Sequence, residues 1–185
     1  MHLPVDDQSE ATLIEQARTG DEAAFDELMR RYKRPVLGFV YRLLGNAEEA
    51  EDVAQEVFVS VYQNLCGYSP RTRFSTWLFA LARNAAIDRL RWRKRHPTVP
   101  LDSAPDPATP TGVVEEVNTH EIGTQIATAV SSLPEDQRTA LVLAEYQGLS
   151  YAEIAEIMRC SEKSVESRLY RAKRTLRKKL RHLLD

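Results

Sequence analysis

Apolar side chains recur every three or four residues along most of the chain, which is the period of an amphipathic helix. No stretch shows the alternation of period two that is typical of a half-buried strand. The clearest apolar stripe comprises Ala50, Val53, Ala54, Val57, Phe58, Val61 and Leu65. The pattern therefore predicts an all-α fold.

Capping residues divide the first half into successive helices. The expected N-terminal caps are Ser9, Asp21 and Asn46. Asn46 and Glu49 are spaced as a capping box, and Gly45 is suited to ending the helix before it. A further helix is expected to begin near Ser75. Pro35 falls inside the second helix and is expected to bend or break it, because proline lacks a backbone N–H donor.

A proline-rich stretch divides the chain. Residues 96–112 hold 5 of the 9 prolines, and a continuous helix cannot run through such a segment. We therefore predict two small helical domains on a flexible linker that leaves their spacing open. The predicted boundaries are 1–95 for the N-terminal domain, 96–118 for the linker and 119–185 for the C-terminal domain.

The end of the chain has the pattern of a helix-turn-helix. Ser150 and Glu153 form a predicted capping box for one helix, and a short turn at 159–161 leads into a second. One face of the second helix is apolar, and the other is polar and basic. This pattern predicts a recognition helix in the major groove of DNA, and a helical hairpin with no role in DNA binding is the alternative.

The net charge of −2 does not suggest a nucleic-acid binder until it is resolved along the chain. Residues 1–60 carry 13 acidic and 6 basic side chains. Residues 83–95 carry 6 basic side chains against one acid, and residues 168–181 carry 8 basic side chains and no acid. This asymmetry indicates an acidic surface for one partner and two basic surfaces for a polyanion. Solvated helix faces with no partner are the alternative.

Two segments of the first half carry candidate chemistry. Residues 68–95 interleave aromatic and basic side chains, a mixture that holds single-stranded nucleic acid by stacking and charge. Trp77 could stack on a base or belong to the core, and both interpretations stay open. Asn84 is a polar amide in mid-helix that could read a base edge. In the acidic segment 46–58, the helix dipole alone explains Glu48 and Glu49, whereas the residues from Asp52 onward could form a protein-docking face.

Four segments in order resemble the extracytoplasmic-function (ECF) sigma factors of bacterial RNA polymerase. They are DEAAFDELMRRY (21–32), EDVAQEVFVSVYQNL (51–65), FSTWLFALARNAAIDRLR (74–91) and LSYAEIAEIMRCSEKSVESRLYRAK (149–173). The resemblance runs from about residue 20 to residue 180. It implies a first domain that binds the polymerase clamp and opens the minus-ten element, and a second domain that reads the minus-thirty-five element.

The residue patterns and the resemblance together predict three sets of site residues. The candidates for the minus-thirty-five element are Lys163, Ser164, Glu166, Ser167, Arg168, Tyr170, Arg171 and Arg174. Those for the minus-ten element are Arg73, Trp77, Arg83, Asn84, Asp88 and Arg91. Those for polymerase binding are Glu51, Asp52, Gln55, Glu56 and Val59. We place Ser164, Ser167, Arg168 and Arg171 on one outward face, with Glu166 to its side.

Two residues depart from the family pattern. Arg159 occupies a turn position where many relatives have glycine, and a left-handed conformation there would cost about 1 kcal/mol. Glu166 stands where relatives often carry a basic residue, so the preferred minus-thirty-five sequence is expected to be unusual.

Other functions find less support in the sequence. No nucleophile–base pair, metal cluster or phosphate-binding glycine loop is visible, so we predict no enzyme, no cofactor and no metal. Cys66 and Cys160 are predicted to be reduced thiols, because they fit no metal-ligand spacing. With no signal-like or membrane-spanning segment, we expect a cytoplasmic monomer whose partners are core RNA polymerase, promoter DNA and an anti-sigma factor. The rival functions are a stand-alone helix-turn-helix regulator and an RNA-binding protein.

Overall fold

The computed structural model describes residues 7–96 and 117–183, and within them it contains helices and no strand. The N-terminal half has α1 (Asp7–Arg18), α2 (Glu22–Leu44), α3 (Ala47–Asn64), the short 3₁₀ helix η1 (Leu65–Gly67) and α4 (Phe74–Arg95). The C-terminal half has α5 (Val117–Ser131), α6 (Glu135–Glu145), α7 (Tyr151–Met158), α8 (Glu162–Lys179) and η2 (Arg181–Leu183). The all-α prediction is confirmed. Most of the predicted linker, residues 97–116, lies outside the described residues.

The predicted caps at Asp21, Gly45 and Asn46 are confirmed, and each acts within one turn of its own helix. The Asp21 carboxylate accepts from the Ala24 N–H at 3.1 Å, and Gly45 ends α2 in the left-handed conformation at φ 72°. Asn46 accepts from the Glu49 N–H at 2.8 Å, while the Glu49 carboxylate pairs with Arg93 of α4. The Ser9 cap was wrong, because α1 already begins at Asp7.

Helix α2 runs through Pro35 without a break, so of the two expected effects, a bend or a break, only the bend stays a prediction. A proline in a helix interior costs about 3 kcal/mol. Full burial of one large apolar side chain contributes about 1.5–3 kcal/mol, and α2 fully buries Leu28 before the proline and Val36 and Phe39 after it. Burial on both sides of Pro35 therefore exceeds the local cost.

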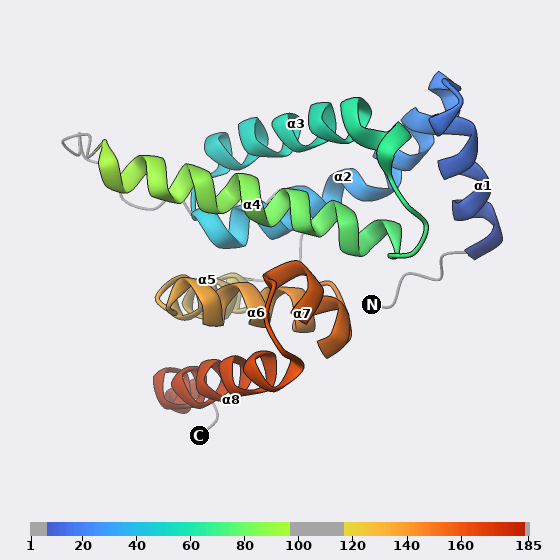
Figure 1. Cartoon of the computed structure of the whole chain (residues 1–185). Helices are drawn as coiled ribbons and strands as arrows, with labels where there is room; N and C mark the ends of the chain where they lie inside the picture. Colours follow the sequence, from blue (N-terminus) through green and yellow to red (C-terminus); the bar gives the residue numbers. More distant parts are fainter. Residues whose placement is uncertain (1–6, 97–116, 184–185) are drawn as a thin grey trace.

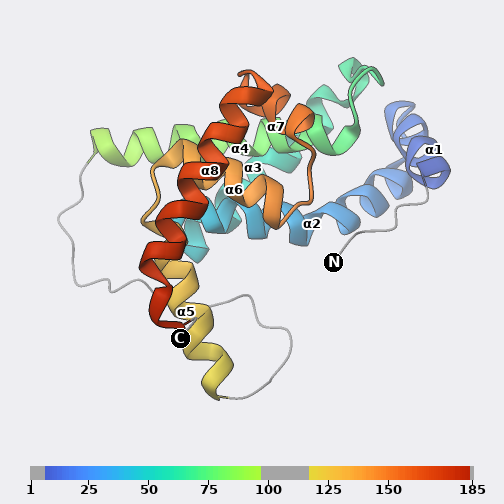
Figure 2. The ribbon, with the colours of Figure 1, turned by 90° about the horizontal axis from the view of Figure 1, so that it is seen from below.

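The helices are stacked in layers (Figure 1). Helices α2, α3 and α4 form one layer, with α1 packed across one end of α2. Helices α5, α6 and α7 lie under this layer, and α8 lies on the far side of them (Figures 1 and 2). The contacts between the halves join α4 to α7 and α2 to α5 and α6. One continuous apolar core results, which contains residues of both halves.

Polar contacts accompany this apolar interface. The Thr72 hydroxyl donates to the Glu156 carboxylate at 2.8 Å, and the Arg73 guanidinium lies 3.5 Å from the Glu153 carboxylate. The guanidinium of Arg42 lies 4.1 Å above the ring of Tyr146. These contacts set the spacing of the two halves, which the sequence left open.

Candidate nucleic-acid and protein interfaces

The helix-turn-helix is built by two caps and a strained turn. The Ser150 N–H donates to the Glu153 carboxylate at 2.8 Å, and the Glu153 N–H donates to the Ser150 hydroxyl at 3.3 Å, so the predicted capping box is present. Arg159 ends α7 in the left-handed conformation at φ 50°. Ser161 then caps α8 by accepting from the Ser164 N–H at 3.2 Å. The two helices are therefore held at a defined angle by local hydrogen bonds.

The capping carboxylate also faces the other half of the chain. Partial burial raises the pKa of Glu153, but hydrogen bonds from Ser150 and the charge of Arg73 outweigh that effect and lower it. Glu153 is thus held ionised at a point where it both caps α7 and pairs with a cation of the N-terminal half.

Helix α8 buries one stripe and presents the other to solvent. Val165, Leu169 and Ala172 are buried in the core. The exposed candidates are Lys163, Glu166, Ser167, Tyr170, Arg171 and Arg174. Ser164 is half-buried at the edge of this face. The Tyr170 side chain is 67% exposed, and Arg171 folds back onto the Ser167 hydroxyl at 2.8 Å. An outward face that mixes cations, hydroxyls and one carboxylate can contact both base edges and phosphates.

Arg168 corrects the predicted face. Its guanidinium pairs with Asp136 of α6 at 3.1 Å and donates to the Cys160 sulfur at 3.0 Å, which leaves its side chain 21% exposed. Successive residues are rotated by about 100° around a helix, so Arg168 lies beside the buried stripe and reaches the neighbouring helix. Glu166 is exposed, and its place to the side of the predicted face stays a prediction.

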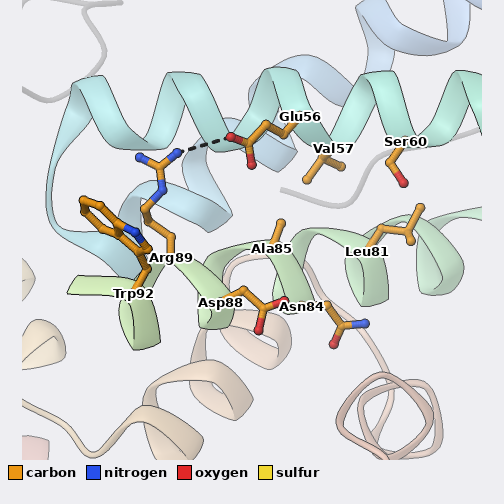
Figure 3. A pocket seen from close by; sticks show the side chains of 9 residues that line it. All are labelled: Glu56, Val57, Ser60, Leu81, Asn84, Ala85, Asp88, Arg89 and Trp92. Atoms are coloured by element: carbon orange, nitrogen blue, oxygen red, sulfur yellow. Dashed lines mark hydrogen bonds and ion pairs between the residues drawn. The ribbon is translucent and has the colours of Figure 1, made fainter. Parts of the chain in front are cut away.

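Helix α4 carries the predicted minus-ten residues along its exposed side. Asn84, Asp88 and Arg91 are exposed. The Arg91 guanidinium lies 3.4 Å from the Asp88 carboxylate, and half-buried Arg83 donates to the Asn84 amide oxygen at 3.4 Å. An open groove of about 500 Å³ runs between α3 and α4, and Asn84 and Asp88 line it (Figure 3). The Asn84 amide is therefore accessible to a ligand.

The other two minus-ten candidates are engaged within the protein. Trp77 is half-buried and packs on Tyr68 and Phe74, with ring centroids 5.2 Å and 5.7 Å away. The core interpretation of Trp77 is thus the one that the structure supports. The Arg73 side chain is 74% exposed and reaches Glu153 of α7.

Two groove residues were missed in the sequence. Trp92 is 49% exposed and lines the groove with Asn84 and Asp88. Arg89 reaches across the groove to Glu56 of α3 at 3.3 Å (Figure 3). The four-residue spacing of Asn84, Asp88 and Trp92 is the signal that could have identified Trp92 as their neighbour.

All five predicted polymerase-binding residues are exposed on α3. Val53, Ala54 and Val57 are buried on its other side. Asp52, Gln55, Glu56 and Val59 line one shallow hollow. Val59 is 56% exposed, so an apolar side chain is ringed by acids and amides. This arrangement is typical of a protein-docking surface with an apolar centre and a charged rim.

The described helices and side chains offer few other kinds of site. Residues 7–96 and 117–183 include no group of three or more side chains that could hold a metal ion. None of the helices described is both long and apolar enough to cross a membrane.

Comparisons with known proteins match both halves of the chain. The model of "Sigma-70 region 2" matches residues 28–96, and that of "Sigma-70, region 4" matches residues 124–176. RNA polymerase sigma-H factor of Pseudomonas aeruginosa is 36% identical, over 96% of each chain. ECF RNA polymerase sigma factor SigW of Bacillus subtilis is 36% identical, over 92% of this chain and 96% of that protein.

Solved structures support the fold. CnrH, in complex with the cytosolic domain of CnrY, superposes with a TM-score of 0.71 at 24% identity, over 94% of this chain and 98% of that one. Two sigma-70 regions in the family order, with relatives that match nearly end to end, show that this chain belongs to the ECF sigma factors, the alternative sigma factors that direct transcription by bacterial RNA polymerase.

Proposed function

We propose that three exposed faces divide the work of promoter recognition. The α3 face of Glu51, Asp52, Gln55, Glu56 and Val59 binds core RNA polymerase. The exposed side of α4, centred on Asn84 and Asp88, contacts the minus-ten element. The exposed face of α8 reads the minus-thirty-five element in the major groove. The protein then acts in the cytoplasm with core polymerase and is itself not an enzyme.

The observation that carries this proposal is the separation of charge between these faces. The α3 face is acidic with an apolar centre, which suits a protein partner and repels DNA phosphates. The last turns of α4 and α8 each carry three successive cations, which suit phosphates. One chain therefore presents a protein-binding face and two DNA-binding faces on different helices.

The minus-ten face also carries groups that can read bases. Extruding a base from a duplex costs a few kcal/mol, which contacts to the flipped base must offset. The exposed amide of Asn84 has both a donor and an acceptor for a base edge. Because Arg83 contacts the Asn84 oxygen at 3.4 Å, the amide is also partly oriented before a base arrives.

The test is promoter-variant transcription by core polymerase with Asn84→Ala. We expect the preference at one minus-ten position to fall, while affinity for core polymerase stays unchanged. Asn64→Ala is a matched control, since Asn64 is an exposed asparagine on α3 that contacts its own helix at Ser60. An unchanged minus-ten preference in the Asn84 variant removes Asn84 from the site.

An anti-sigma partner is part of the same proposal. CnrH is solved with the cytosolic domain of CnrY, and RpoE of Bartonella quintana is solved with the anti-sigma factor NepR. We expect a protein of this kind to bind the present chain outside its polymerase complex. Titration of the purified chain with a candidate anti-sigma domain should then block its binding to core polymerase, and simultaneous binding of both would contradict the expectation.

A further inference from the structure

Trp92 is the feature of the DNA-facing side that the proposed function leaves unused. The chain has two tryptophans. Trp77 packs into an aromatic cluster with Tyr68 and Phe74, whereas Trp92 is 49% exposed near the C-terminal end of α4. Tryptophan, with an apolar body and a polar N–H, is enriched at binding interfaces.

The surroundings of Trp92 are those of a nucleic-acid contact. It lines the same groove as Asn84 and Asp88, and its indole lies beside Arg89 (Figure 3). Arg93, Lys94 and Arg95 follow it in the last turn of α4. An aromatic face flanked by cations is the combination that holds a base by stacking and its phosphates by charge.

The Trp92 indole already stacks on another ring of the protein, that of His96. The His96 ring lies 4.8 Å from the Trp92 ring at an interplanar angle of 22°. A near-parallel arrangement of this kind is the one that a nucleobase adopts on an aromatic side chain. A base can extend this stack or take the place of His96.

The position of Trp92 along α4 indicates which base it meets. Trp92 is eight residues beyond Asn84, which is about 12 Å along the helix axis at about 1.5 Å per residue. With about 3.4 Å per nucleotide along a strand, that distance spans three to four nucleotides.

We propose that the Trp92 indole stacks on a promoter base of the minus-ten region, three to four nucleotides from the base that Asn84 contacts. The inference rests on the proposed function, because it takes the exposed side of α4 as the minus-ten surface. The stack tolerates any base, since every base has a π-face. Trp92 is therefore a contact that adds affinity and positions the strand, and Asn84 is the residue that reads base identity.

The experiment uses core polymerase reconstituted with the full chain. The probe is a minus-ten DNA that the wild-type holoenzyme selects from a randomised pool. Its non-template strand then carries an abasic nucleotide at each position in turn. We expect the wild type to lose roughly 5- to 150-fold in affinity where the stacked base is removed, which is the effect of one base–aromatic stack.

The variants identify the position. Trp92→Ala should lose the sensitivity to an abasic nucleotide at one position, three or four nucleotides away from the position where Asn84→Ala loses it. Trp92→Phe should keep the wild-type profile, because it retains an aromatic face. Tyr62→Ala is a control for the loss of another exposed ring, as Tyr62 is 62% exposed on α3 outside the groove.

Each outcome supports or overturns the inference. If Trp92→Ala weakens binding equally on all abasic probes, or keeps the wild-type profile, Trp92 does not stack on a base. If it impairs binding to core polymerase instead, Trp92 belongs to the protein interface and the inference is wrong. If Trp92→Ala loses the sensitivity to an abasic nucleotide at one position and Asn84→Ala loses it at none, the assignment of Asn84 as a base reader fails. Stacking by Trp92 then stands, but its spacing from a base read by Asn84 does not.

Discussion

Docking of the C-terminal half against the minus-ten segment predicts that the free chain is closed. Glu153 and Glu156 of α7 engage Arg73 and Thr72, the residues that precede α4. The Glu153 carboxylate therefore occupies Arg73, a cation that we expect to contact a DNA phosphate, and Glu156 accepts from Thr72 beside it. Loss of the polar contacts across the interface should shift the chain toward an open form.

The structure sets the size of this shift. The Thr72–Glu156 hydrogen bond contributes about 0.5–1.5 kcal/mol. The Arg73–Glu153 pair contributes at most about 1 kcal/mol, because Arg73 is 74% exposed. Tyr146 under the Arg42 guanidinium adds about 0.5–1 kcal/mol. Together they amount to roughly 1–3.5 kcal/mol, or about a 5- to 300-fold change in the docking equilibrium.

The variant that removes these contacts is Tyr146→Ala, Glu153→Gln and Glu156→Ala combined. Glutamine at 153 keeps the capping box, since it can still accept from the N-cap. Glu145→Gln is the matched control, because it breaks the 2.7 Å pair with Lys173 inside the C-terminal half. Small-angle scattering of the free protein measures the result.

A compact chain of 185 residues has a radius of gyration of about 16 Å. The wild type and the control should lie near this value, apart from the contribution of the linker, and the triple variant should be measurably larger. Identical scattering from the triple variant and the wild type at the same salt concentration would refute the reasoning. The docking would then rest on the apolar contacts alone.

Three further predictions concern the helix-turn-helix. In holoenzyme binding selections at fixed salt, Arg171→Ala should lower affinity for minus-thirty-five DNA about 5- to 150-fold. In the same selections, Glu166→Arg should raise the affinity and change the selected sequence. If both variants give the wild-type affinity and sequence, α8 does not read this element. Arg159→Gly should raise the free energy of unfolding by up to about 1 kcal/mol, because φ is 50° there, and an unchanged urea midpoint would contradict this. The pKa of Glu153 is lowered in the fold, so its contribution to stability is complete above the unfolded-state pKa of about 4.3 and is lost as pH falls through the folded pKa. Between pH 6 and pH 3, the free energy of unfolding measured in urea should therefore fall more for the wild type than for Glu153→Gln. Equal losses would show that this carboxylate contributes nothing.

The parts of the fold that the sequence predicts well depend on local chemistry. Asp21, Gly45 and the Ser150–Glu153 pair act within one turn of the chain, so their residue types and spacing are sufficient. The helix-turn-helix follows from the same kind of signal. The Ser9 cap failed because nothing local stops α1 from starting two residues earlier.

Site residues near the edge of a helical face needed the packed structure. Arg168 lies between the buried and exposed stripes, and the presence of Asp136 on α6 decides that it turns inward. Trp77 and Trp92 both occur in an aromatic and basic segment, yet only the neighbours brought together by folding bury one and expose the other. The pairing of α7 with Arg73 joins residues 80 positions apart, which no local pattern encodes.

Promoter-directed initiation by core polymerase is the function from which the other assignments follow. The most direct measurement sequences the transcript starts made on genomic DNA by purified core polymerase, with and without this chain. We predict new start sites that share a minus-ten and a minus-thirty-five sequence at fixed spacing, and the sites should disappear when Asp52 and Glu56 are both changed to lysine. No new start sites with the wild-type chain, or a tight sequence-specific footprint by the chain without polymerase, would contradict the assignment.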